Sequence, residues 1–269
     1  MGSSHITVPL FVPGDRPDRF EKAAGSGADA IIIDLEDAVP ADAKDIARTS
    51  LGAHFANVPV LIRVNGEGTP WHADDIAAVL ALSVVAGIII PKAELNGGLA
   101  TLAAGSRVPV LALIETARGL SQARDIAVVP GIERLVFGSV DFSADLGCAH
   151  TREALLAARS ELVVASRLAH LAAPIDGVTI AIDDTELATS DARYALELGF
   201  GGKLAVHPRQ IPAIWSGLNP QQSEIDWANR VLASGDGAIA VGGEMVDEPV
   251  RIRARAILAR ATVGRCFTV

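Results

Sequence analysis

Two acidic side chains, Glu115 and Asp141, each follow a short apolar segment and could together hold one metal ion. Residues 110–114 and 135–138 are apolar on both faces, which is typical of strands buried in a parallel sheet. A carboxylate that follows such a strand lies at the edge of the sheet where α/β folds place their chemistry. Carboxylate oxygens suit a hard divalent cation such as Mg²⁺. Taken alone, either residue could instead be a helix cap or a rim carboxylate.

Ionisable residues also follow other predicted strands, and this is what favours a catalytic mouth over a structural rim. Six of the eight predicted strands end in such residues, whereas the opposite strand ends carry mainly Gly, Ala, Pro and Val. In a barrel these ends converge on one mouth. The residues are Asp34, Glu36 and Asp37 (second strand), Arg63 (third), Lys92 (fourth), Glu115 (fifth), Asp141 (sixth) and His207 (eighth).

Their charges suggest roles. Arg63 offers a planar guanidinium that could bind a substrate carboxylate. It could equally form an ion pair with the acidic segment 34–37. The two interpretations are compatible, because that segment could orient Arg63 and the waters around the metal. Lys92 could form a Schiff base, but the acidic residues nearby favour an ion pair. His207, before Pro208, is interpreted as a structural histidine that forms a hydrogen bond.

The elements that must position these side chains alternate between strand and helix along the chain. Eight repeats predict a (β/α)8 TIM barrel over residues 6–218 with a C-terminal helical extension over 219–269, which would pack on the barrel or on a neighbouring subunit. A doubly wound open sheet is the alternative architecture. The predicted strands span residues 6–12, 30–35, 60–64, 87–91, 110–114, 135–138, 177–182 and 203–207. The predicted helices span 17–24, 41–55, from 70, 99–104, 120–128, 152–171, 185–198 and 208–215, then 223–233 and 249–261 in the extension.

Composition narrows the class of protein. A net charge of −9 over 269 residues argues against nucleic acid and anionic membranes as partners. The only two cysteines, Cys148 and Cys266, argue for a reducing compartment. No signal peptide or membrane span is evident, so we expect a cytoplasmic protein. Basic side chains near the first helix, Arg16 and Lys22 among them, could receive phosphates, or could simply form a solvated face.

A series of motifs spread over nearly the whole chain resembles the HpcH/HpaI aldolase superfamily, in its citrate lyase β-subunit-like branch with the malyl-CoA and citramalyl-CoA lyases. The Asp-Leu-Glu-Asp segment favours that branch over the short-chain class II pyruvate aldolases. The motifs are Phe11-Val-Pro-Gly-Asp-Arg16, Ile33-Asp-Leu-Glu-Asp37, Arg63-Val-Asn65, Gly68-Thr-Pro-Trp-His72, Pro91-Lys92, Ile114-Glu115-Thr, Gly138-Ser-Val-Asp141, Lys203…His207-Pro and Met245-Val-Asp247-Glu-Pro.

The resemblance implies residue roles. It implies Mg²⁺ on Glu115 and Asp141, substrate beside Gly138, Asp141 and Glu115, and a 2-oxo acid carboxylate on Arg63. Three further sets of residues are carried over in the same way: Glu36, Asp37 and Lys92 around the metal and its waters, CoA contacts at Arg16 and Lys22, and a catalytic Asp247 that reaches the active site of a neighbouring subunit. The family is commonly trimeric or a dimer of trimers, so we expect a homo-oligomer.

The expected activity is Mg²⁺-dependent carbon–carbon cleavage of a 3-hydroxyacyl-CoA thioester of malyl, citramalyl or citryl type, giving a 2-oxo acid and acetyl-CoA. Three alternatives stay open: the β subunit of a citrate lyase complex acting on an acyl-carrier thioester, a CoA-independent class II aldolase for small hydroxy-oxo acids, and a non-catalytic barrel that binds an acyl-CoA or a partner. Glyoxylate, pyruvate and oxaloacetate differ little at a pocket wall, so the sequence favours none of them.

Overall fold

The structure is a computed structural model that describes residues 5–52, 58–235, 239–241 and 244–264. By its internal contacts the chain divides into two units, Met1–Ile214 and Trp215–Val269. The division falls inside helix α10 (Ile211–Leu218), slightly before the boundary at residue 219 that we proposed from the sequence.

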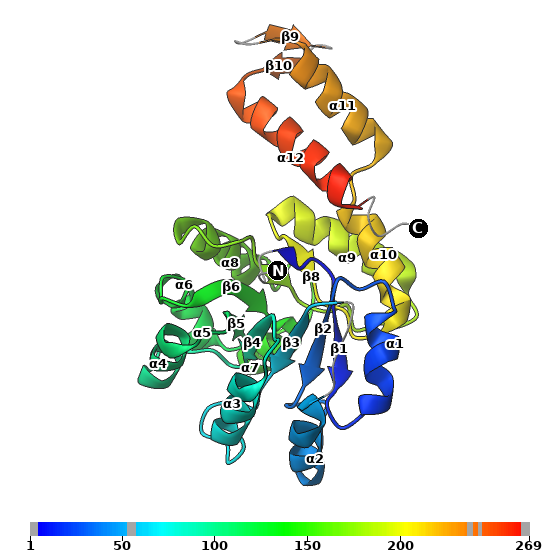
Figure 1. The fold of residues 1–269 in the computed structure, drawn as a ribbon. Helices are drawn as coiled ribbons and strands as arrows, with labels where there is room; N and C mark the ends of the chain where they lie inside the picture. The colour runs from blue at the N-terminus through cyan, green and yellow to red at the C-terminus, as the bar shows by residue number, and fades with distance from the viewer. Residues whose placement is uncertain (1–4, 53–57, 236–238, 242–243, 265–269) are drawn as a thin grey trace. The chain divides into compact units, whose positions relative to one another are not determined.

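The first unit is a barrel of parallel strands that follow one another in chain order (Figure 1). The sheet closes between its first and last strands through backbone hydrogen bonds. The Lys203 N–H donates to the Thr7 carbonyl over 2.9 Å, and the Ala205 N–H donates to the Pro9 carbonyl over 3.0 Å. These bonds connect the last strand to the first, so the predicted (β/α)8 barrel is confirmed and the open sheet is excluded. The strands are β1 (Pro9–Pro13), β2 (Ala30–Asp34), β3 (Val60–Arg63), β4 (Gly87–Ile90), β5 (Val110–Ile114), β6 (Ile132–Phe137), β7 (Ile175–Asp176) and β8 (Gly202–Lys203).

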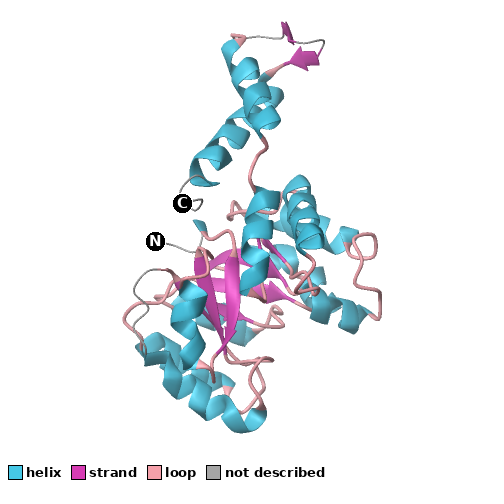
Figure 2. Ribbon diagram, turned by 90° about the vertical axis from the view of Figure 1, so that its right-hand side faces the viewer, coloured by secondary structure: helices cyan, strands magenta, loops and turns pink. Residues whose placement is uncertain are grey.

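Helices surround the strands of this unit (Figure 2). The α-helices are α1 (Phe20–Ala24), α2 (Lys44–Thr49), α3 (His72–Ala81), α4 (Gly97–Gly105), α5 (Ala117–Ser121), α6 (Ala123–Ala127), α7 (Ser139–Leu146), α8 (Leu156–Leu168) and α9 (Thr185–Leu198), followed by α10. Short 3₁₀ turns are η2 (Pro17–Arg19), η3 (Ala41–Ala43), η4 (Ser50–Gly52) and η5 (Pro208–Gln210).

Several elements differ from the prediction; strand β8, for example, was expected over 203–207 and spans Gly202–Lys203. Strand β7 precedes the expected segment 177–182, because the chain leaves the sheet at Gly177, whose missing side chain makes room for Ser139. The expected helix 120–128 is two short helices, α5 and α6, that meet at Gln122. Helix α7 was not predicted; it begins after Gly138 and ends at Gly147 in the left-handed region with φ of 68°.

Side chains that alternate along the strands build the barrel interior. The same alternation places Asp34, Arg63 and Glu115 two residues beyond a core residue of their own strands, so they face the mouth. The interior residues are Ile6, Ala30, Ile32, Leu61, Ile89, Leu111, Leu113, Val136, Ile175 and Leu204.

The second unit has its own small core. Helices α11 (Gln222–Ala233) and α12 (Glu248–Gly264) pack together, and β9 (Ile239–Val241) pairs antiparallel with β10 (Glu244–Val246). Both helices lie close to the spans expected from the sequence. Residues 236–238 and Cys266 lie outside the described residues.

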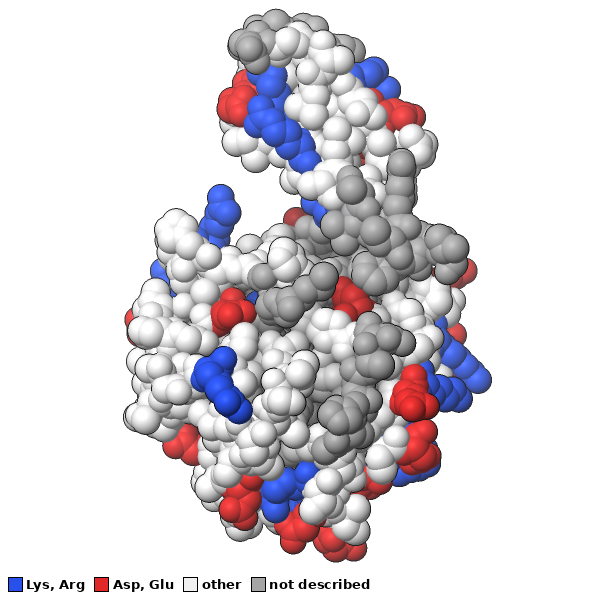
Figure 3. Space-filling view, viewed as in Figure 1, with Lys and Arg blue, Asp and Glu red and all other residues white. Residues whose placement is uncertain are grey.

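Two surface properties bear on partners. On the face shown in Figure 3, acidic and basic side chains are mixed over the first unit, whereas basic side chains form a stripe on the second unit. Within the described residues, no helix combines the length and apolar character needed to cross a membrane.

Candidate active site

A buried ion pair between β2 and β3 forms the base of the candidate site. The Nε and Nη2 atoms of Arg63 each donate to one oxygen of Asp34 over 2.7 Å, and the two side chains are 9% and 1% exposed. Burial opposes the charge of Arg63, but the hydrogen bonds and charge of Asp34 outweigh it and raise the pKa of the guanidinium. This confirms the ion pair between Arg63 and the acidic segment, and it leaves Nη1 to face the other carboxylates of the site.

The acidic segment after β2 turns back over the barrel mouth. The oxygens of Asp34 also accept the backbone N–H groups of Glu36 (2.9 Å) and Ala38 (3.0 Å), which fixes the turn. Nη1 of Arg63 lies 3.0 Å from Oε2 of Glu36 and 3.5 Å from Oδ2 of Asp37. The carboxylates of the turn therefore gather around one guanidinium, as the sequence suggested.

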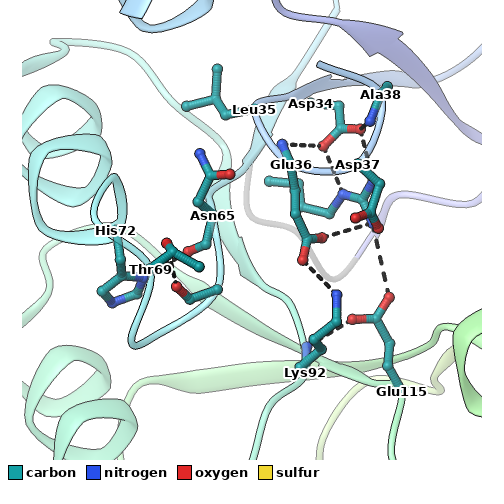
Figure 4. Close-up of polar contacts among 12 residues, drawn as sticks. Asp34, Leu35, Glu36, Asp37, Ala38, Asn65, Thr69, His72, Lys92 and Glu115 are labelled. Atoms are coloured by element: carbon teal, nitrogen blue, oxygen red, sulfur yellow. Dashed lines mark hydrogen bonds and ion pairs between the residues drawn. The ribbon is translucent and has the colours of Figure 1, made fainter. Parts of the chain in front are cut away.

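Lys92 forms an ion pair instead of standing free as a nucleophile. Its Nζ donates to Oε1 of Glu36 over 2.7 Å (Figure 4). Burial lowers the pKa of Lys92, but the hydrogen bond and charge of Glu36 raise it by more, so the amine is charged. The backbone of Lys92 has φ of 48°, in the left-handed region, and its N–H donates to Oε2 of Glu115 over 2.7 Å. The ion-pair interpretation is thus confirmed, and a Schiff-base role does not fit.

Lys44 is a site residue that the sequence analysis missed. Its Nζ donates to the carbonyl oxygens of Leu35 and Glu36, each over 2.7 Å, and lies over the ring of Trp71. Burial lowers the pKa of this amine, while the charges of nearby carboxylates oppose that shift. The residue lies at the start of α2 in an ordinary Ala-rich helix sequence, so no local pattern could have identified it.

Glu115 is buried directly after β5 and depends on the absence of a side chain at Gly138. It is 2% exposed, and a Cβ on Gly138 would lie 2.2 Å from its Cγ and 2.6 Å from its Oε1. Glycine at the start of α7 therefore leaves the space that the carboxylate occupies. Nη1 of Arg63 lies 3.9 Å from Oε1 of Glu115, which links the carboxylate to the Arg63 cluster.

Asp141 lies in the first turn of α7, not at the end of a strand as we predicted. It is half-buried and lines the same cavity as Glu115, Arg63 and Gly138. The cavity measures about 380 Å³. Among the described residues, the Asp141 carboxylate has no hydrogen-bond or ion-pair partner. The remaining lining is mainly apolar and includes Phe11, Leu113, Phe137, Val140, Val178 and Leu204.

The electrostatics of the cavity favour a cation. Burial, followed by the charge of Glu36, raises the pKa of Glu115 to about 8, and burial raises the pKa of Glu36 as well. Within the described residues no three His, Cys, Asp or Glu side chains form a complete metal centre. Two carboxylates that share a cavity with room for water and substrate oxygens are a donor set that fits Mg²⁺, which keeps several non-protein ligands.

The other predicted site residues have different partners, are exposed, or belong to the second unit. His207 accepts the Arg209 N–H at Nδ1 over 3.1 Å, which confirms its structural role as the cap of η5. Arg16 pairs with the exposed Asp18, and Lys22 is exposed on α1. Asp247 precedes α12, where its Oδ1 accepts the Val250 N–H over 3.2 Å.

A (β/α)8 barrel with buried carboxylates and a guanidinium at the C-terminal mouth of its strands has the architecture of an enzyme. Residues 7–208 match the family described as HpcH/HpaI aldolase/citrate lyase. The chain belongs to this family, which confirms the resemblance seen in its motifs, and it is an enzyme of the citrate lyase β-subunit type.

Relatives match over almost the whole chain. A citrate lyase subunit beta-like protein of Deinococcus radiodurans is 34% identical over 273 residues, 93% of this chain and 95% of the relative. A (3S)-malyl-CoA thioesterase of Cereibacter sphaeroides is 34% identical over 96% of this chain and 95% of its own. Protein CitE of Mycobacterium tuberculosis, solved in complex with magnesium, acetoacetate and coenzyme A, superposes with a TM-score of 0.88 at 34% identity, covering 96% of this chain and 99% of that one.

Proposed function

We propose that this protein is a Mg²⁺-dependent lyase that cleaves a 3-hydroxyacyl-CoA thioester into a 2-oxo acid and acetyl-CoA. The observation that carries the proposal is that Glu115, Asp141 and Arg63 line one cavity at the barrel mouth. The complex of the related M. tuberculosis protein with magnesium, acetoacetate and coenzyme A supports the same ligand classes here.

Glu115 and Asp141 would hold the metal. When bound, Mg²⁺ supplies positive charge where the hydroxyl of the substrate loses its proton. Glu115 must give up its own proton to bind, because its pKa is raised to about 8 without a cation. Gly138 keeps the space for its carboxylate open, and Glu36 and Asp37 would orient water around the metal.

Arg63 would position the carboxylate of the 2-oxo acid through one N–H edge. Its Nε and Nη2 atoms are bound to Asp34, so a bidentate grip from that edge is not open to a substrate. Nη1 is the donor on the cavity side, and its distance of 3.9 Å from Glu115 places it beside the residue that would bind the metal. Arg63 therefore orients the substrate relative to Glu115.

The bond changes require one further proton carrier. Cleavage would transfer the hydroxyl proton to a water that Glu36 and Asp37 would orient, break the bond between the hydroxyl-bearing carbon and its neighbour, and leave the electron pair on a thioester enolate, which gains a proton at carbon. We assign that last proton to Asp247 of a neighbouring subunit, so the enzyme would act as a homo-oligomer, a trimer or hexamer. Arg16 and Lys22 would contact coenzyme A near the start of the first helix.

Two of the alternatives differ in the substrate that they need. A β subunit of a citrate lyase complex would require an acyl-carrier thioester, and a class II aldolase would act without any thioester. The charged Lys92 argues against a Schiff-base aldolase as well, since a charged amine is not a nucleophile.

The test is an assay of the purified protein with Mg²⁺ against malyl-, citramalyl- and citryl-CoA. Released 2-oxo acid is trapped as its phenylhydrazone, and free CoA thiol is measured in parallel. Oxo acid without free thiol is the expected result. Free thiol without oxo acid would indicate a thioesterase, the activity for which the C. sphaeroides relative is named, and would refute the proposal.

Two substitutions connect the activity to the site. Asp141→Ala and Glu115→Ala should each abolish Mg²⁺-dependent turnover while the barrel stays folded. Asp125→Ala removes an exposed carboxylate on α6 and serves as the control that keeps activity. Ordinary lyase rates in the Asp141 or Glu115 variant would refute the metal assignment.

A further inference from the structure

A second cavity adjoins the candidate active site and is lined by the segment after β7 and by residues of helices α8 and α9. It measures about 480 Å³. Val178 lines both cavities. Ser139 of the first cavity and His150 of the second are joined by a hydrogen bond of 2.9 Å between Oγ and Nε2. The proposed reaction uses none of the charged residues around this second cavity.

One buried carboxylate beside the cavity faces two cations. Oδ1 of Asp176 accepts from Nε of Arg159 over 2.8 Å, and Oδ2 lies 3.3 Å from Nζ of Lys203. The side chains of Arg159, Asp176 and Lys203 are 7%, 1% and 1% exposed. Lys203 also donates to the Gly177 carbonyl over 2.7 Å. The buried cluster of Arg159, Asp176 and Lys203 therefore has a net charge of +1.

The other charged residues at the cavity do not cancel that excess. Arg152 pairs with Asp191 over 2.8 Å, and Asp191 also accepts the hydroxyl of Thr179, so this pair is balanced. Burial, then the charges of Arg159 and Lys203, lower the pKa of His150. Burial and the same positive field thus favour the neutral form of the histidine.

The guanidinium of Arg159 has an unused donor. Its Nη1 atom is buried and has no hydrogen-bond partner among the described residues, while the group lies over the rings of Phe137 at 5.4 Å and Tyr194 at 5.9 Å. A buried donor without a partner costs about 1–3 kcal/mol. An oxygen of a bound anion would remove that cost and neutralise the excess charge.

Much of the remaining cavity wall is apolar. Leu155, Val178, Ile180, Ala181 and Leu187 line it together with the hydroxyl-bearing Thr151 and Thr179, and Ile180 and Leu187 are 57% and 40% exposed. A ligand that satisfies Arg159 and also fills this space must carry one negative charge on a short hydrocarbon body, because a larger polar ion would leave its own groups unpaired against these side chains.

We propose that this second cavity binds a short-chain aliphatic monocarboxylate, with its carboxylate at Arg159 and its hydrocarbon end among Leu155, Ile180 and Leu187. The site is separate from the metal cavity and does not depend on Mg²⁺.

Butyrate is the probe, and isothermal titration of the full-length protein in EDTA is the measurement. Leu187→Trp fills the cavity without altering any charge, and Leu168→Trp adds the same ring at an exposed position of α8, 61% exposed, that does not line it. We expect saturable binding that Leu187→Trp weakens at least tenfold and that Leu168→Trp leaves unchanged.

Titrations with two other ligands test whether the site requires a carboxylate on a hydrocarbon chain. Butyramide, which lacks the charge, should bind at least tenfold more weakly than butyrate. Inorganic phosphate that binds where butyrate does not would overturn the proposal, as would butyrate binding that is equal in wild type and Leu187→Trp. If Leu187→Trp does not fold, Ile180→Trp blocks the same cavity from the loop after β7.

Discussion

Gly138→Ala should disable the proposed metal site through a single added methyl group. The new Cβ would lie 2.2 Å from Cγ of Glu115, whereas carbon atoms pack at about 3.5–4.0 Å. The Glu115 side chain must therefore move by more than about 1 Å, which breaks its hydrogen bond from the Lys92 N–H at 2.7 Å.

The cost can be estimated from these two effects. Overpacking costs about 1–3 kcal/mol, and loss of a hydrogen bond to a charged acceptor costs about 1.5–3 kcal/mol. If about 2–4 kcal/mol of the total falls on metal binding, the Mg²⁺ affinity drops by roughly 30- to 700-fold. The assay is the Mg²⁺ concentration that gives half-maximal lyase turnover.

Gly97→Ala is the matched control, because a Cβ at the start of α4 meets no atom within 4 Å. It should leave the Mg²⁺ dependence unchanged. If Gly138→Ala behaves like Gly97→Ala, Glu115 does not occupy the space beside Gly138 during binding, and the reasoning fails.

Four more predictions concern the same cluster. The pKa of Glu115 in the folded protein is raised to about 8 from its ordinary value of 4.5. Its contribution to the stability of the metal-free protein is therefore fully present below pH 4.5 and is lost as the pH rises through about 8. Urea unfolding in EDTA at several pH values should show this loss of stability, and Glu115→Gln should remove it. Mg²⁺ affinity should rise with pH over the same window, as titration calorimetry would show, since the carboxylate must lose its proton to bind; pH-independent affinity would contradict the assignment. Lys44→Met removes the donor to the Leu35 and Glu36 carbonyls and should lower the free energy of unfolding by about 2–3 kcal/mol and weaken Mg²⁺ binding, whereas an unchanged urea midpoint would show that the loop holds without it. Borohydride added with pyruvate should leave turnover intact, because Lys92 is a charged partner of Glu36; a reduced adduct detected by mass spectrometry would refute this.

The barrel was predictable because its signals are local and periodic. Strand segments such as 30–33 and 110–114 are apolar throughout, and alternation along them fixes which residues face the mouth. The same argument brought Arg63 and Glu115 to one site. Strand β7 was placed wrongly because its pairing covers only Ile175 and Asp176, too short for any periodic pattern.

Contacts between segments that are distant in the sequence could not be predicted from local patterns. Asp141 was expected at the end of a strand, but the chain turns into α7 at Gly138, and the reason for that glycine is the side chain of Glu115, which follows another strand. Lys44 acts on carbonyls of the preceding loop, so its role exists only in the folded chain. The excess charge at Arg159 likewise arises from Asp176 and Lys203, which come from separate strands.

The ion pairs at the mouth are unevenly distributed around the ring of strands. Side chains from β2, β3 and β4 and the turns that follow them are cross-linked through Arg63 and Lys92, whereas Val140 and Val178, which follow β6 and β7, line the opposite part of the cavity with apolar atoms. Substitutions on the cross-linked side disturb several charges at once, but substitutions at these two valines change only shape. An effort to evolve this enzyme toward bulkier acids should therefore randomise the second half of the barrel and leave the first half intact.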